Sequence, residues 1–144
     1  MRSFTKILLL SACLMMTSES IAYSCSGGQS EIINNIQFCK SNQVMNWLSA
    51  LTWCDANGGK LAEYNTVCPG GDCSEFKGKF PTDHWGYLNK FSGKKVSRIN
   101  FSTGEIRDNN TAINRPIGYD YEGAGLNEYD KRAITDIHAL CQPK

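Results

Sequence analysis

The sequence lacks the excess of basic residues expected of a protein that binds nucleic acid. Fifteen Lys and Arg face 14 Asp and Glu, so the formal net charge at pH 7 is only +1. Nucleic-acid binding depends on clustered Lys and Arg that neutralise phosphates. The basic pairs Lys94-Lys95 and Lys131-Arg132 are isolated, and no Lys/Arg-rich amphipathic helix indicates membrane-surface binding. We therefore expect no nucleic-acid partner.

Catalytic motifs are also missing. The sequence contains no G-x-S-x-G, P-loop or dinucleotide fingerprint, and Gly123-Ala124-Gly125 is too short to count as one. Asp120 and Glu122 form a glycosidase-like carboxylate pair on one side of an extended segment, but nothing distinguishes them from an ordinary exposed acidic pair. We therefore expect a protein that is not an enzyme, with a secreted hydrolase as the distant alternative.

The apolar run near the N-terminus is too short to cross a bilayer, which takes about 20 apolar residues. Arg2 and Lys6 precede this run, which begins at Ile7 and extends to about residue 16. Ser20 and Ala22 then stand at the −3 and −1 positions of a cleavage site. This pattern predicts a secretory signal peptide over 1–22 and no stable membrane span. Cys13 follows a Leu-Ser-Ala stretch, so lipidation at a bacterial lipobox is the alternative.

The remaining residues, 23–144, suit a single domain. They retain six of the seven cysteines, and an even number in an exported chain predicts a disulfide framework, although the number alone leaves 15 connectivities open. A zinc site needs free thiolates and spacing such as C-x-x-C, and the two histidines lie far apart in sequence. We therefore expect no metal and no cofactor. The six cysteines are Cys25, Cys39, Cys54, Cys68, Cys73 and Cys141.

The strongest helix signal lies between residues 46 and 57. Trp47, Ala50, Leu51 and Cys54 recur at i, i+3, i+4 and i+7, which places them on one face, and Val44 and Leu48 widen this apolar stripe. Asn46 is a good N-cap, and the Asn-Gly-Gly that follows is typical of a helix end.

Short strands account for most of the remaining pattern. A weak strand signal covers 32–36, a stronger one covers 84–88, and 137–141 forms a terminal strand. Residues 96–101 alternate apolar and polar side chains and turn through 102–104 into 105–107, which predicts a hairpin. Residues 68–73 are a tight turn, whereas 108–130 are rich in Asn, Gly, Tyr and acidic residues and predict a long irregular loop. One helix with several strands predicts an α+β domain.

Part of this pattern resembles the C-type-lectin-like domains. The stretch FC (38–39), WLSA (47–50) and CDANGGKLA (54–62) is similar to the first half of that family. WGYL (85–88) resembles its Trp-Ile-Gly-Leu core strand, and ALC (139–141) resembles its closing strand. Small bacterial exported proteins share this pattern. The resemblance implies short antiparallel strands, one main N-terminal helix, a long irregular loop region and a core that includes Trp47, Ala50, Leu51, Leu61 and Trp85.

The resemblance also implies a disulfide pairing. It pairs Cys54 with Cys141, which ties the helix to the last strand, and Cys25 with Cys39, which closes an N-terminal hairpin. Cys68 and Cys73 are left as a local bridge, which departs from the family's usual second bridge.

The same resemblance implies a binding function. Calcium-dependent members carry Glu-Pro-Asn or Gln-Pro-Asp followed by Trp-Asn-Asp, and neither motif occurs in this sequence, so we expect calcium-independent binding. The candidate ligand-binding residues combine aromatic faces with hydrogen-bond acceptors; the alternative is that Tyr119 and Tyr121 pack on the core. They are Tyr119, Asp120, Tyr121, Glu122 and Asn127.

We therefore expect a secreted, periplasmic or cell-surface module for adhesion or carbohydrate binding. Its partner would be a glycan or a cell-surface protein. The alternative is a structural or assembly subunit of a surface appendage.

Overall fold

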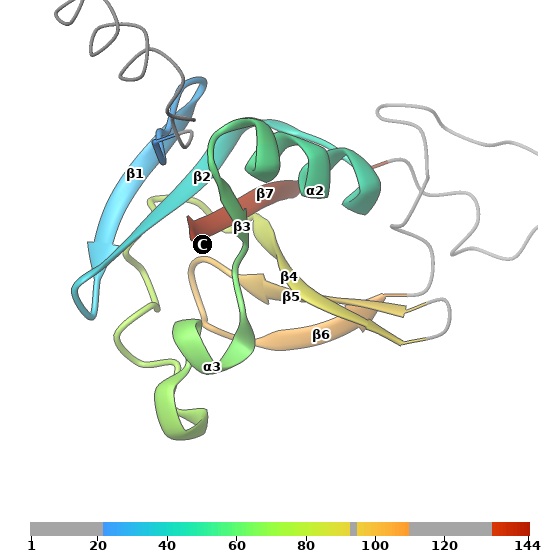
Figure 1. Ribbon diagram of the computed structural model, residues 1–144. Coiled ribbons are helices and arrows are strands. Elements are labelled where there is room, and N and C mark those ends of the chain that lie inside the picture. Colours follow the sequence, from blue (N-terminus) through green and yellow to red (C-terminus); the bar gives the residue numbers. More distant parts are fainter. Residues whose placement is uncertain (1–21, 93–94, 110–133) are drawn as a thin grey trace, which may run out of the picture.

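The computed structural model describes residues 22–92, 95–109 and 134–144 as a mixed α+β fold, which confirms the predicted class (Figure 1). A seven-stranded sheet has the order β1-β2-β7-β4-β5-β6, and β3 also pairs with β7. The strands are β1 (Gly28–Ile33), β2 (Ile36–Val44), β3 (Gly59–Leu61), β4 (Trp85–Ser92), β5 (Lys95–Asn100), β6 (Ile106–Asn109) and β7 (Ile137–Pro143). The helices are α2 (Trp47–Ala56) and α3 (Tyr64–Val67), and a 3-10 turn covers Pro69–Gly71.

The terminal strand β7 lies in the middle of this sheet. One of its edges pairs with β2, and the other is shared by β3 and β4. The pairing with β4 is parallel, with Trp85 opposite Ile137 and Gly86 opposite His138, whereas β2 and β3 run antiparallel to β7. Six of the seven β7 residues are buried. The strand predicted at the end of the chain is therefore the strand that joins the two halves of the sheet.

Helix α2 forms as the sequence predicts. The Asn46 side chain accepts a hydrogen bond from the Ser49 N–H at 2.8 Å, and the helix ends before Gly58, whose φ of 79° only glycine adopts without strain. Trp47, Ala50 and Cys54 are buried against the sheet. Leu51 is half-buried, which confirms its packing on the core only in part.

One side chain of the predicted stripe was assigned wrongly. Leu48 is 48% exposed. It follows Trp47 directly, and a step of one residue turns a side chain about 100° around the helix, which carries Leu48 off the buried face. Val44 is partly buried against the core, as expected.

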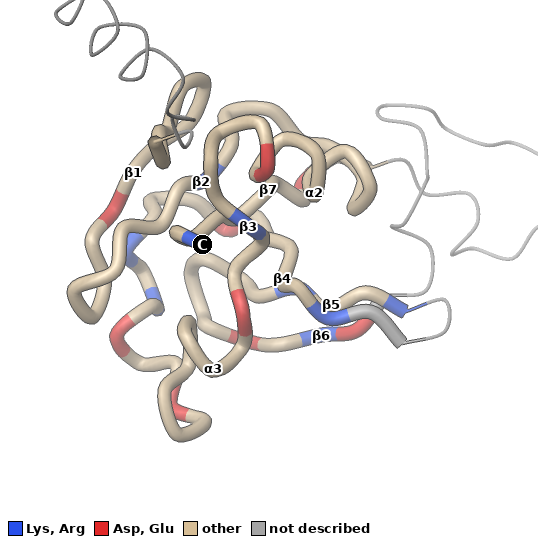
Figure 2. Tube along the Cα trace, viewed as in Figure 1, with Lys and Arg blue, Asp and Glu red and all other residues tan. Residues whose placement is uncertain are grey.

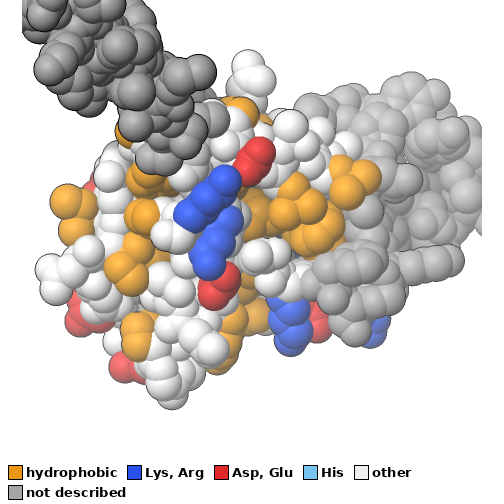
Figure 3. All heavy atoms as spheres, in the orientation of Figure 1, with side chains coloured by type: hydrophobic (Ala, Val, Ile, Leu, Met, Phe, Trp, Pro, Cys, Tyr) orange, Lys and Arg blue, Asp and Glu red, His pale blue; other side chains and the backbone are white. Residues whose placement is uncertain are grey.

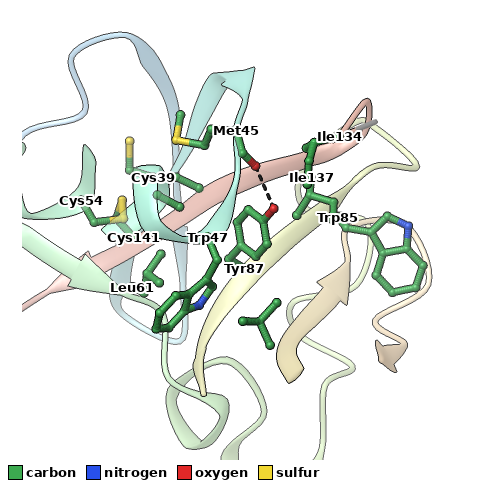
Figure 4. Close-up of a cluster of buried hydrophobic side chains, with 13 residues drawn as sticks. Cys39, Met45, Trp47, Cys54, Leu61, Trp85, Tyr87, Ile134, Ile137 and Cys141 are labelled. Atoms are coloured by element: carbon green, nitrogen blue, oxygen red, sulfur yellow. Dashed lines mark hydrogen bonds between the residues drawn. A yellow bond between two sulfur atoms is a disulfide. The ribbon is translucent and has the colours of Figure 1, made fainter. Parts of the chain in front are cut away.

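Core side chains fill both faces of the sheet. One cluster lies under α2 and contains Trp47, Leu61, Trp85 and Tyr87, and the Tyr87 hydroxyl donates to the Met45 carbonyl at 2.8 Å (Figure 4). The other cluster lies under the segment 63–83. Successive β7 residues alternate between the two, because neighbouring side chains in a strand point to opposite faces. This second cluster is built on Phe38, Phe76, Phe80, Phe101 and Leu140.

The N-terminal strands correct the sequence prediction. Residues 32–36 are not one strand, because the chain turns at Asn34 and Asn35, whose φ angles are 52° and 62°. Two residues with positive φ make the tight turn that matches the twist of a hairpin, and asparagine tolerates this conformation. Strand β2, which was not predicted, follows at once. The predicted strands at 84–88 and 137–141 and the hairpin over 96–107 are confirmed.

Three disulfides match the pairing that the resemblance implied, namely Cys25–Cys39, Cys54–Cys141 and Cys68–Cys73. Cys39 of β2 stands directly opposite Cys141 of β7. Two of the bridges therefore lie next to each other, and together they connect the N-terminal segment, β2, β7 and α2. Figure 4 shows Cys39, Cys54 and Cys141 close together.

Replacing both Cys54 and Cys141 by Ala should cost the most stability of the three pairs. They are 87 positions apart in the sequence, against 5 for Cys68 and Cys73. In the chain-entropy model such loops are worth about 4.6 and about 2.2 kcal/mol. The yield of folded, oxidised protein compares the two variants. We expect Cys68→Ala/Cys73→Ala to accumulate in the folded form and Cys54→Ala/Cys141→Ala to fail, and equal yields would contradict this ranking.

Candidate functional site

The predicted ligand-binding residues Tyr119, Asp120, Tyr121, Glu122 and Asn127 lie outside the described residues, which stop at 109 and resume at 134. The ends of this segment are nevertheless placed. Asn109 ends β6 opposite Val96 of β5, and Ile134 is buried in the cluster under α2 together with Val96. Ile134, where the described chain resumes, therefore lies on the α2 side of the sheet.

Trp85 and two arginines lie together on this side of the sheet. The Cζ atoms of Arg98 and Arg107 are 4.4 and 5.3 Å from the centroid of the Trp85 ring, within cation–π range. Arg98 of β5 is directly opposite Arg107 of β6. On its other side Arg98 is opposite Tyr87 of β4, which is two residues from Trp85. We call these three residues, Trp85, Arg98 and Arg107, the Arg–Trp cluster. The electron-rich ring offsets part of the repulsion between the facing guanidinium groups.

The outer arginine of this cluster is accessible. The Arg107 side chain is 56% exposed, and its Nε donates to Glu105 at 2.8 Å. An exposed ion pair of this kind contributes little stability, so it holds the side chain only loosely. A guanidinium group carries five donors in a planar fork and therefore retains donors for a ligand. Trp85, by contrast, is buried, and its ring contacts the two guanidinium groups from the core side.

The structure also brings together the two histidines, which are 54 positions apart in the sequence. His84 Nδ1 lies 2.8 Å from His138 Nε2, and the rings stack with centroids 5.1 Å apart. The parallel pairing of β4 with β7 produces this contact, since it sets Gly86 opposite His138. The pair was not predicted, and the signal in the sequence was weak: the chain has only two histidines, and each borders or lies in a predicted strand.

Hydrogen bonding determines how this histidine pair is protonated. His138 Nδ1 lies 2.7 Å from the Ser41 carbonyl oxygen, which can only accept, so Nδ1 carries the proton. In a neutral ring Nε2 is then the acceptor, and His84 Nδ1 donates to it. A second proton on His138 would make Nε2 a donor, and His84 would then have to switch tautomer so that its Nδ1 accepts.

The surroundings of His138 favour its neutral form. Burial is the largest cause and, with the charges of Lys40 and His84, lowers the pKa of His138 to about 4, against the bond to Ser41 and the charge of Asp136. Burial also lowers the pKa of Lys40, whose Nζ donates to the same Ser41 carbonyl at 3.4 Å. Ser41 lies where the β2–β7 register shifts, and its hydroxyl accepts from the Ala139 N–H at 2.9 Å. The histidine pair therefore fastens an irregular part of β2 to β7.

A third group of polar side chains forms alternating exposed ion pairs. Lys60 contacts Glu63 at 2.7 Å, and Lys144 contacts Asp55 at 3.0 Å. Basic and acidic residues are dispersed along the described chain (Figure 2), and on the face shown in Figure 3 they lie next to one another instead of forming a patch of one sign. Exposed pairs of this kind are weak, so we assign no binding role to them.

Within residues 22–92, 95–109 and 134–144, no three His, Cys, Asp or Glu side chains are grouped so that they could hold a metal ion. In the same ranges no helix has the length and apolar character needed to cross a bilayer. No protein-family model matches the chain, and comparisons with curated proteins and with solved structures give no match.

The free energy of unfolding should fall between pH 6.5 and pH 4 because of His138. Its pKa is about 4 in the folded chain and about 6.5 when unfolded, so the unfolded chain takes up a proton first as the pH falls. The contribution is complete above pH 6.5 and amounts to at most roughly 3.4 kcal/mol, since one pKa unit is about 1.4 kcal/mol.

Urea unfolding at pH 7 and pH 4.5 tests this for the native chain and for His138→Gln. The Gln side chain offers a donor and an acceptor but does not titrate, so the drop should be smaller in the variant. Carboxylates contribute equally to both proteins and cancel in the comparison. Identical pH dependence of the two would show that His138 contributes nothing.

Proposed function

We propose that the chain is an exported, C-type-lectin-like binding module that recognises a glycan or a cell-surface protein through residues 108–130. The architecture supports the family assignment. The main helix α2 is tied by Cys54–Cys141 to a closing strand, and Cys25–Cys39 joins the N-terminal segment to its hairpin. These are the features that the sequence resemblance implied. Because one fold serves many functions, the binding role needs a site argument of its own.

The Arg–Trp cluster supplies that argument. It lies on the α2 side of the sheet, where Ile134 is also buried, and its member Arg107 is two residues before Asn109, the last described residue ahead of the predicted loop. Binding loops commonly extend from a rigid scaffold, and in this fold two hydrogen-bonded strands and a buried tryptophan form the base. The exposed Arg107 can donate to the hydroxyl and carboxylate oxygens of a glycan or to the carbonyl and carboxylate oxygens of a protein. In this proposal the tyrosines of the segment supply the aromatic faces that contact the ligand.

The described carboxylates beside the cluster support binding without calcium. Asp108 accepts a hydrogen bond from the Ser97 hydroxyl at 2.7 Å, and Glu105 accepts from Arg107 at 2.8 Å. Calcium takes six to eight oxygen ligands, and several of them are usually carboxylates. Both of these carboxylates serve partners within the hairpin, and the calcium motifs of the family are missing from the sequence. We therefore propose a calcium-independent and non-catalytic site.

A glycan and surface-protein binding screen on the exported chain tests the proposal. Once a ligand is found, Tyr121→Ala and Arg107→Ala should each weaken its affinity about tenfold or more, which corresponds to about 1.4 kcal/mol or more. The matched control is Tyr64→Ala. Tyr64 is a tyrosine that is 39% exposed, and it lies on α3, which packs on the opposite face of the sheet.

Melting temperatures of all three variants, with calcium and with a chelator, separate lost contacts from lost fold. We expect unchanged melting and the same affinity with or without calcium. The absence of any ligand in the screen, or equal loss in Tyr64→Ala, would overturn the proposed site. Turnover that disappears in Asp120→Asn or Glu122→Gln would establish an enzyme instead.

A further inference from the structure

Strand β1 is an edge strand with little protection against pairing. In the part of the chain that the structure describes, its one neighbouring strand is β2 (Figure 1). Natural edge strands are usually kept short or guarded by charged residues and proline. At the other edge of the sheet, β6 is four residues long and carries Arg107 and Asp108. Strand β1 has six residues, no proline and Glu31 as its one charge, and its Ile32 is 72% exposed.

The hairpin turn determines which backbone groups β1 presents outward. A two-residue turn with positive φ at both positions makes the flanking residues, Ile33 and Ile36, a hydrogen-bonded pair. Alternate β1 residues then bond to β2, and the backbone groups of Gly28, Ser30 and Ile32 point away from it. The Gly28 N–H already donates to the Cys25 carbonyl at 3.3 Å. The outward edge thus offers the Gly28 carbonyl and both backbone groups of Ser30 and Ile32.

We propose that β1 pairs with β1 of a second copy of this chain, antiparallel, across a two-fold axis at Ser30. Ser30 then faces Ser30 of the second copy, and Ile32 faces its Gly28. All outward-pointing residues meet outward-pointing residues in this register, as an antiparallel ladder requires. The Ser30 pair exchanges two hydrogen bonds, and each Ile32 N–H donates to a Gly28 carbonyl. The two sheets become one continuous sheet.

The side chains select this register over its neighbours. Gly28 has no side chain, and the sulfur of Cys25, which is partly exposed, lies on its side-chain face, so Ile32 of the second copy has an apolar group to contact. Glu31 faces Gln29, whose amide donates to a carboxylate; within one copy these two groups are already 3.4 Å apart. A shift of the axis to Glu31 would set two carboxylates opposite each other, which is unfavourable. A shift to Gln29 would leave Ile32 without a strand partner.

The proposed pairing is distinct from both the binding module and the appendage subunit. When two copies pair through the same surface across a two-fold axis, the assembly is complete as a dimer. An appendage subunit, by contrast, must bind a further copy through a second surface so that the polymer can grow. It is also independent of the proposed ligand site, because β1 and β6 are the two opposite edges of the sheet. Failure of one proposal therefore leaves the other standing.

Sedimentation velocity of the exported chain over a concentration series tests the pairing. We expect a monomer–dimer equilibrium, and Ile32→Lys should shift it at least tenfold toward the monomer. Leu48→Lys is the matched control, since Leu48 is also an exposed aliphatic side chain of the same size but lies on α2. A native chain that stays monomeric throughout, or an equal shift by both variants, would overturn the proposal.

Cysteine cross-linking tests the register separately. Directly opposite residues in a strand pair lie within the Cα separation that a disulfide needs, so Ser30→Cys should form a covalent dimer under mild oxidation. Gln29→Cys, on the same strand, faces Glu31 and should not cross-link to itself. A dimer that cross-links through position 29 and not through position 30 would refute the register.

Discussion

The rest of the structure depends on the strand pairing between β2 and β7, in which Cys39 stands opposite Cys141. Each of these two residues also forms a disulfide, Cys39 with Cys25 and Cys141 with Cys54. Strand β7 in turn carries β3 and β4 on its other edge. Without β7 the hairpin β1–β2 and the ribbon β4–β5–β6 would share no strand. Because β7 comes from the end of the chain, its contacts span nearly the whole sequence, and this kind of non-local pairing cannot form until the last residues are present.

Local signals made the helix and the later hairpin predictable. The signals for the helix all lie within a few residues of it, and each is found where the sequence predicts it. They are the N-cap Asn46, the spacing of Trp47, Ala50 and Cys54, and Gly58 after the helix end. The turn at Asn34 and Asn35 was missed because asparagine signals a turn less firmly than glycine does, and the isoleucines on both sides continue an apolar run. The disulfide pairing came from the family resemblance, since the cysteine count left every connectivity open.

Contacts between distant strands could not be predicted from local signals. The histidine pair depends on parallel pairing between β4 and β7, which are joined by a long intervening chain, and no local pattern reports such a pairing. The Arg–Trp cluster is an intermediate case. The hairpin over 96–107 was predicted, and its register sets Arg98 opposite Arg107, but the third member comes from another strand. The residues proposed to contact a ligand directly remain predictions from the sequence. The described fold shows only the Arg–Trp cluster, which lies close in sequence to the start of their segment.

Hydrogen–deuterium exchange of the oxidised chain tests most directly whether β7 holds the fold together. If it does, the backbone amides of Ala139, Leu140 and Cys141 exchange through global unfolding and are among the slowest in the chain, while those of the edge strand β6 exchange faster through local opening. Exchange in β7 as fast as in β6 would show that the two halves of the sheet separate without unfolding, and it would contradict the central role of β7.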